Sequence, residues 1–240
     1  MAVKAGPSES MSKSKKNVID PELIIKNYGA DSVRLFILSD SPPEKDVQWS
    51  EQGMVSSYKF IQKIWKLHLK ILEKIKKNYK KDIDKNLHKI TNIFIKNVSD
   101  NLNNFSYNKI IANLHETYNQ LLLESEKEYT KESIIENYQK ILIVMMPIIP
   151  HFSNECLKDI GLGEIKEWPD VNKDLLIEKN TNYVIQINGK KRAVIQAKKD
   201  LTENELLNKL NNNTDLEKYI KDKNIKKKIF VPNKLINIIV

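Results

Sequence analysis

The sequence predicts a mainly α protein with a small α+β domain at its C-terminal end. Between about residues 50 and 160, apolar residues recur every three or four positions, which is the period of amphipathic helices. After residue 176, two short apolar runs flank Asn188-Gly189, a dipeptide that accepts positive φ at both positions and so favours a tight hairpin turn. We therefore expect an antiparallel helical bundle followed by a β-β-α-α-β-β module.

Length and composition agree with two folded domains. The chain has 240 residues and a mass of 28.0 kDa, enough for two hydrophobic cores. The order of patterns predicts a loop and connecting segment at 1–49, the bundle at 50–162, a linker at 163–175 and the C-terminal module at 176–240. The single cysteine, Cys156, excludes an internal disulfide, and the four histidines lack zinc-ligand spacing, so we expect no metal site. No apolar run approaches the roughly 18 residues that span a bilayer, so we expect a cytoplasmic protein without membrane contact.

One short helix is predicted before the bundle, over Pro21–Tyr28. Asp20 suits its N-cap, and Gly29 suits the residue just past its end. An apolar run at residues 33–38 follows it.

The bundle is predicted to contain four long helices, over about residues 50–75, 83–102, 106–123 and 131–146. The buried face of the first is expected to carry Tyr58, Ile61, Trp65, Leu72 and Ile75. The buried face of the second is expected to carry Ile83, Leu87, Ile90, Phe94, Val98 and Leu102. Pro147 and Pro150 end the fourth helix, and a short fifth helix ends at Gly161.

The C-terminal module begins with a predicted hairpin whose strands lie at 183–187 and 191–197. Thr202 and Thr214 each precede a glutamate by three residues, which is the spacing of a capping box and predicts two short helices. Residues 229–231 and 235–240 form the predicted closing hairpin.

The net charge of +9 is concentrated in this module. Residues 176–240 hold 14 basic and seven acidic residues, whereas residues 51–175 hold 19 and 17. A small domain with this imbalance attracts polyanions and releases counterions on binding them, as nucleic-acid-binding domains do. A solvated surface, arising from a general abundance of Lys, Asn and Ile, explains the same count, so charge alone leaves both interpretations open.

A polar loop at residues 11–17 has the sequence MSKSKKN. Its hydroxyls, ammonium groups and backbone amides can fold over a triphosphate and neutralise the charge that develops on a leaving pyrophosphate. A short Ser/Lys run alone is more often merely solvated. Here it is followed by VIDP at 18–21 and GADSVRLF at 29–36, and this context favours the nucleotide role.

With these residues the chain resembles the class I aminoacyl-tRNA synthetases, and among them the C-terminal part of the bacterial-type leucyl-tRNA synthetases. The resemblance covers nearly the whole chain. It rests on a KMSKS-type signature at 10–14, GADSVRLF at 29–36, SPPE at 41–44, MPIIPH at 146–151, VIQINGK at 184–190 and VPNKLINIIV at 231–240. It implies a helical bundle of the anticodon-binding type and a tRNA-binding C-terminal domain.

In that family the signature loop helps to activate leucine with ATP. The resemblance implies that Lys13 is the catalytic lysine that stabilises the triphosphate. The implied ATP-binding loop comprises Met11, Ser12, Lys13 and Ser14. Ser10 departs from the family, which has lysine there, and Lys15 or Lys16 is the candidate to replace that charge. ATP with Mg²⁺ is implied as a substrate of the full-length enzyme, and no cofactor is expected on these 240 residues alone.

The family's C-terminal domain reaches the tRNA corner where the D and T loops meet. The candidates for phosphate or sugar contacts are therefore Lys190, Lys191, Arg192, Lys226, Lys227 and Lys228. Solvated edge-strand residues that discourage aggregation explain the same positions. Asp31 and Arg34 lie three residues apart, so on a helix they share a face and could pair. We expect a structural role for both rather than contact with a substrate. His151 is expected to begin a helix, with no carboxylate beside it.

The family's nucleotide-binding fold and proofreading domain are absent from this sequence, which has no His-x-Gly-His motif and no parallel βαβ pattern. We therefore expect part of a longer leucyl-tRNA synthetase, catalytically incomplete alone and monomeric. Its expected partner is tRNA(Leu), with leucine and ATP bound only together with the missing catalytic domain. The alternative is a stand-alone tRNA-binding module of the same ancestry without catalytic activity.

Overall fold

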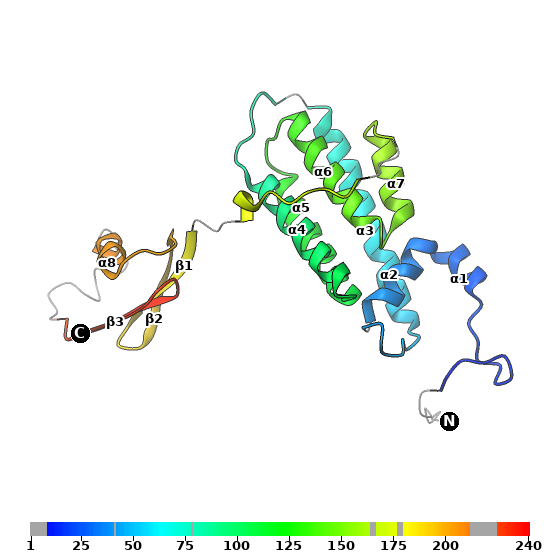
Figure 1. The fold of residues 1–240 in the computed structure, drawn as a ribbon, viewed down its shortest axis with the longest axis horizontal. Coiled ribbons are helices and arrows are strands. Elements are labelled where there is room, and N and C mark those ends of the chain that lie inside the picture. Colours follow the sequence, from blue (N-terminus) through cyan, green and yellow to red (C-terminus); the bar gives the residue numbers. More distant parts are fainter. Residues whose placement is uncertain (1–8, 41, 78, 164–166, 177–179, 212–224) are drawn as a thin grey trace. The chain divides into compact units, whose positions relative to one another are not determined.

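A computed structural model describes residues 9–40, 42–77, 79–163, 167–176, 180–211 and 225–240. The chain divides into two compact units, Met1–Leu176 and Ile177–Val240, and each has its own hydrophobic core (Figure 1). The first unit is helical, and the second contains the sheet. The fold is thus mainly α with a small α+β part, as the sequence predicts.

Two short helices, α1 (Pro21–Tyr28) and α2 (Ala30–Asp40), precede the bundle. The predicted cap of α1 is present, because the Asp20 carboxylate accepts a hydrogen bond from the Glu22 amide at 2.9 Å. Gly29 ends α1 at a φ of 80°, a conformation that other residues adopt only with strain. The apolar run that follows lies in α2, whose Leu35 side chain belongs to the core of the first unit.

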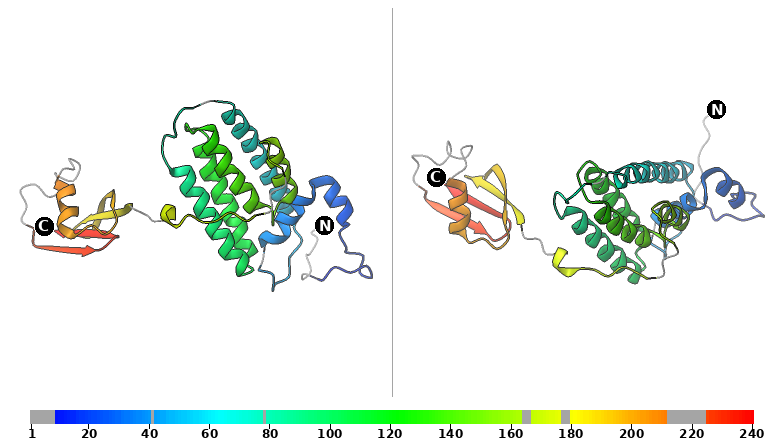
Figure 2. Two further views of the ribbon diagram at one scale, coloured as in Figure 1. Left: turned by 45° about the horizontal axis from the view of Figure 1, so that its top comes forward. Right: turned by 90° about the horizontal axis from the view of Figure 1, so that it is seen from above.

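Five further α-helices and a short 3₁₀ helix, Lys173–Leu176, follow in the described part of the first unit. The α-helices are α3 (Glu51–Ile75), α4 (Asn86–Asn103), α5 (Tyr107–Glu124), α6 (Lys131–Met145) and α7 (Pro150–Asp159). Helices α3 to α6 lie side by side, and α2 and α7 pack against them (Figure 2). Apolar side chains from all six helices meet in one core, which confirms the predicted bundle.

Two details of the predicted bundle are wrong. The core side chains of α3 are Met54, Phe60, Ile64, Leu67 and Ile71, whereas Trp65 of the predicted face is 36% exposed. Both faces repeat with the helical period, so the period alone could not choose between them. Ile83, predicted on the second helix, is 62% exposed in the loop before α4. That helix begins later because the Asn86 amide donates to Asp84 Oδ1 at 2.8 Å.

The second unit is a four-stranded sheet with one described helix on it. The strands are β1 (Asn180–Ile187), β2 (Lys190–Lys198), β3 (Lys227–Val231) and β4 (Leu235–Ile239), in the order β2-β1-β4-β3. The β1/β2 and β3/β4 pairs are antiparallel, and β1 pairs with β4 in parallel. Helix α8 (Glu203–Asn211) buries Leu206 and Leu210 against one face of this sheet.

The turn and capping signals of this unit are confirmed where the structure describes them. Asn188 and Gly189 have φ values of 49° and 76°, as the tight turn requires. The Glu205 amide donates to Thr202 Oγ1 at 3.3 Å, and the Thr202 amide donates to Glu205 Oε2 at 2.8 Å, which completes the first capping box. The second predicted box, at Thr214, lies outside the described residues. None of the helices that the structure describes has the length and apolar character to cross a bilayer.

Candidate nucleotide loop and nucleic-acid interface

The predicted nucleotide loop is a turn held by its own polar groups. The amides of Lys15 and Lys16 donate to the carbonyl oxygens of Ser12 and Lys13, respectively, both at 3.2 Å. The hydroxyls of Ser12 and Ser14 lie 3.2 Å apart. Bonds between near neighbours thus set the turn, so its shape follows from this short stretch of sequence.

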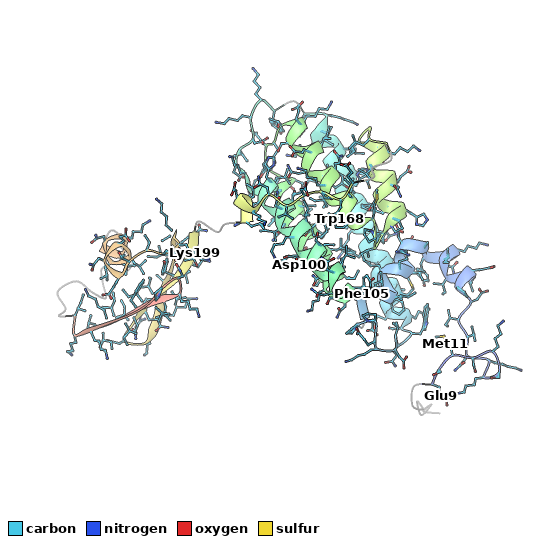
Figure 3. All side chains as sticks on the ribbon, viewed as in Figure 1. Glu9, Met11, Asp100, Phe105, Trp168 and Lys199 are labelled. Carbon is cyan, nitrogen blue, oxygen red and sulfur yellow. The ribbon has the colours of Figure 1, made fainter. Side chains whose placement is uncertain are left out.

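Lys13 lies in this turn with its side chain exposed. Among the described residues, no hydrogen bond or ion pair engages its ammonium group, whereas the Lys15 ammonium lies 3.0 Å from Glu9 Oε2. Met11 is 46% exposed, and Figure 3 shows Met11 and Glu9 in the loop that precedes α1. An ammonium group without a partner, in a small turn, is suited to bind an anion. The roles predicted for these residues stay predictions.

The carboxylate of Asp31 binds the start of α7 and does not pair with Arg34. It is 6% exposed, and its carboxylate accepts hydrogen bonds from the amides of Phe152 at 2.6 Å and His151 at 3.3 Å. Asp31 Oδ1 also lies 2.9 Å from His151 Nδ1. A carboxylate at a helix N-terminus satisfies free amides and interacts favourably with the helix dipole. Asp31 thus has a structural role, as expected, but its partner is the start of α7 and not Arg34. The expectation that no carboxylate accompanies His151 is wrong.

Arg34 completes this contact, which we call the α2–α7 joint. Its Nε donates to the Ile148 carbonyl at 2.9 Å, and its Nη2 donates to the Pro147 carbonyl at 2.6 Å. Asp31 thus satisfies amides in the first turn of α7, and Arg34 satisfies carbonyl groups of the connection between α6 and α7. A groove of about 560 Å³ lies beside the joint, lined in part by Tyr28 and Trp65.

The register of the sheet brings the two predicted basic groups of the second unit to the same end. One row of paired residues runs across the four strands through Lys190, Ile187, Ile238 and Lys228. Three strand spacings of about 4.8 Å place the two lysines roughly 14 Å apart. All six predicted side chains are exposed: Lys190, Lys191, Arg192, Lys226, Lys227 and Lys228.

A polar cluster that the sequence did not signal fixes the connection between α3 and α4. Asp82 Oδ1 accepts hydrogen bonds from the Thr130 amide at 2.7 Å and from its hydroxyl at 3.0 Å. Asp84 Oδ1 accepts one from the Tyr129 hydroxyl at 2.7 Å, and its Oδ2 lies 3.2 Å from the Lys127 ammonium. These partners lie more than 40 positions away in the chain, so no local pattern could reveal them.

Both of these carboxyl groups have a pKa below the ordinary value. Burial alone would raise the pKa of Asp82, but the hydrogen bonds from the Thr130 backbone and side chain outweigh it. Burial is likewise outweighed at Asp84, whose pKa is lowered by its bonds to the Asn86 amide and the Tyr129 hydroxyl. Both groups therefore remain charged and hydrogen-bonded at neutral pH.

Buried titratable groups in the bundle are structural. Cys156 is fully buried, and burial raises the pKa of its thiol to about 12, so the thiol stays protonated and unreactive. His68 is also fully buried, 3.1 Å from the Tyr138 hydroxyl and 3.0 Å from Asp159 Oδ2. This network joins α3, α6 and α7.

Residues 84–207 match the family described as the anticodon-binding domain of tRNA ligase. That stretch is more than half of the chain. The chain belongs to this family. Residues 2–50, which precede this stretch and include the predicted nucleotide loop, match the family described as tRNA synthetases class I (I, L, M and V).

Three relatives of this chain are leucine–tRNA ligases. The ligase of Orientia tsutsugamushi is 42% identical over 243 residues and aligns with 99% of this chain. The ligases of Prochlorococcus marinus and Petrotoga mobilis are 37% and 35% identical and align with 97% and 96% of it. The chain spans only 28 to 30% of the length of these relatives. The predicted similarity to leucyl-tRNA synthetases is confirmed.

A solved structure agrees with the fold of the anticodon-binding chain. It is the crystal structure of the ternary complex of Agrobacterium radiobacter K84 agnB2 LeuRS, tRNA and LeuAMS. The match has a TM-score of 0.72 and 22% sequence identity, and it covers 95% of this chain and 30% of that one. The likeness confirms the mainly helical fold.

Proposed function

We propose that this chain is the part of a leucine–tRNA ligase that binds tRNA(Leu) and carries the signature loop. The ligase attaches leucine to tRNA(Leu) through a leucyl-adenylate made from ATP, as a cytoplasmic monomer. The observation that carries the proposal is an anticodon-binding domain in a chain that aligns almost completely with leucine–tRNA ligases. In this proposal residues 1–49 form the loop and connection, 50–162 the anticodon-binding-type bundle, 163–175 a linker and 176–240 a tRNA-binding domain.

Lys13 stabilises the triphosphate as the adenylate and pyrophosphate form. Its exposed, uncommitted ammonium supports this role, because a cation aimed at developing charge is most effective when no other group holds it. Met11, Ser12 and Ser14 complete the loop beside it. The described residues gather no group of three acidic, histidine or cysteine side chains that could hold a metal ion.

The basic residues at one end of the sheet contact tRNA phosphates. Lys190 and Lys228 lie in one row roughly 14 Å apart, so a single stretch of RNA backbone can meet both groups. The six basic residues lie at the end of the sheet that holds the turn after β1 and the start of β3, in or directly before the two outer strands. This grouping supports binding over the alternative of scattered lysines that only keep sheet edges soluble.

The role of Lys13 is tested by Lys13→Ala in the complete ligase. Leucine-dependent pyrophosphate exchange should fall by about 100-fold or more, the usual effect of removing one group that stabilises transition-state charge. The matched control is Lys26→Ala, an exposed lysine on α1. If exchange stays within twofold of the wild type and only RNA affinity changes, the second candidate holds, a tRNA-binding module without a chemical role.

The tRNA contact is tested with Lys190→Ala, Lys191→Ala, Lys227→Ala and Lys228→Ala combined in this chain. Binding to a tRNA(Leu) transcript should weaken, and its dependence on salt concentration should become shallower, because fewer counterions are released. A titration of the wild type that does not depend on salt would contradict phosphate binding.

A further inference from the structure

A basic surface on the first unit has no residue assigned a role in the function proposed above. It lies at the end of α3 and along the connection to α4, and we call it the α3–α4 lysine patch. Its members are Lys76, Lys77, Lys80, Lys81 and Lys85, and all are exposed. Within the described part of the chain, no hydrogen bond or ion pair engages any of these five ammonium groups.

The sequence conceals this patch because acidic residues are interleaved with the lysines. Residues 76–85 contain five lysines and two aspartates. The structure separates the two signs. Asp82 is turned toward Thr130, and Asp84 toward Tyr129 and Lys127, so both carboxylates are engaged, although the Asp84 side chain remains 43% exposed. The aspartates therefore anchor the loop while the lysines remain on its surface.

Lysines at the border of the patch are, by contrast, already engaged. Lys70 forms an ion pair with Glu126. Lys74 donates to the Lys127 carbonyl at 3.1 Å, and the Lys127 ammonium lies 3.1 Å from Glu124 Oε1. Glu124 and Glu126 are thus paired with other cations, and no ion pair among the described residues joins any of the five patch lysines.

We propose that the α3–α4 lysine patch binds phosphates of the RNA backbone, as a second contact surface in addition to the basic residues of the second unit. The proposal rests on the tRNA-binding function proposed above and adds a site to it. Five flexible point charges in one loop match a row of phosphates, and each phosphate neutralised releases counterions. A protein partner would need an apolar centre, and Ile83 is the one large apolar side chain exposed among the described residues 76–85.

The experiment compares the salt dependence of tRNA(Leu) binding in three forms of the full chain, by fluorescence anisotropy. The patch variant combines Lys76→Gln, Lys77→Gln, Lys80→Gln and Lys81→Gln, and leaves Lys85 in place because it precedes α4. The charge-matched control combines Lys59→Gln, Lys63→Gln, Lys109→Gln and Lys158→Gln, which are exposed positions on α3, α5 and α7. Circular dichroism and tryptophan fluorescence check that each variant is folded.

The patch variant should lower the slope of log K against log salt by up to about 3, since each phosphate contact contributes roughly 0.7 to 0.9. Its affinity should fall about 10- to 100-fold at low salt, while the control should change the slope by less than about 1. Equal losses in both variants would show that only total charge matters and would overturn the proposal.

Two further outcomes separate this proposal from the function on which it rests. If the wild type binds tRNA(Leu) and the patch variant binds it equally well, the patch proposal fails and the tRNA-binding function stands. If the wild type binds no RNA, both fail. Vesicles containing phosphatidylserine provide the last comparison: a patch variant that keeps its RNA slope but loses vesicle binding would assign the surface to a membrane and overturn the RNA proposal.

Discussion

Replacing Asp31 with alanine is expected to destabilise the first unit by about 3 kcal/mol, because the start of α7 loses its acceptor. A hydrogen bond to a charged group contributes about 1.5 to 3 kcal/mol, and the bond from the Phe152 amide is short, at 2.6 Å, and buried. The bond from the His151 amide, at 3.3 Å, adds less. Asp31→Asn keeps one acceptor oxygen but loses the charge, so its effect should be about half as large.

Urea unfolding followed by tryptophan fluorescence measures this loss. The three tryptophans, Trp49, Trp65 and Trp168, all belong to the first unit, so the signal reports that unit and not the sheet. Trp168, for example, donates from its indole N–H to Ser99 on α4 at 2.9 Å. At about 2 kcal/mol per molar urea, a loss of 3 kcal/mol lowers the midpoint by about 1.5 M.

Two comparison variants make the reasoning refutable. Asp40→Ala removes an exposed carboxylate from the same helix and should leave the midpoint nearly unchanged. His151→Ala removes a side chain that is 74% exposed while keeping the backbone amides, and should cost less than about 1 kcal/mol. If Asp31→Ala came within about 0.5 kcal/mol of Asp40→Ala, the joint would not be a source of stability.

Three further predictions concern buried or crowded groups. Cys156 should not react with a thiol reagent such as DTNB at pH 8 in the native protein and should react fully after denaturation, because its pKa is raised to about 12 by burial; rapid native labelling would contradict this. The hydrogen bonds between Asp82 and Thr130 should stabilise the protein above about pH 4, and this contribution should be lost as the pH falls through the lowered pKa of Asp82. The difference in unfolding free energy between the wild type and Asp82→Asn should therefore shrink between pH 6 and pH 3. Gly53→Ala should lower the melting temperature despite the better helix propensity of alanine, because the new Cβ would lie 2.8 Å from Phe36 Cε2; an unchanged or higher melting temperature would show that this ring moves freely.

Local signals in the sequence determined most of the secondary structure. The cap at Asp20, the capping box at Thr202 and the turn at Asn188-Gly189 each depend on residues no more than a few positions apart. Such interactions are decided by the chain near them, so their patterns can be interpreted directly. The same holds for the signature loop, whose hydrogen bonds join near neighbours, and for the motif series that indicated the family.

Packing between distant segments decided the rest. The period of α3 allowed two apolar faces, and only the surrounding helices selected the one with Phe60 and Ile64. Asp31 could reach Arg34 on its own helix, yet the free amides of α7, about 120 positions away, offered a buried carboxylate more hydrogen bonds than one exposed ion pair. Likewise, the pairing of strands brought Lys190 and Lys228 into one row. The sequence by itself therefore determined the helices and strands and the family. The tertiary structure decided which charged groups anchor one segment to another and which remain exposed to bind a partner. Burial and long-range hydrogen bonds exist only once the helices and strands are packed.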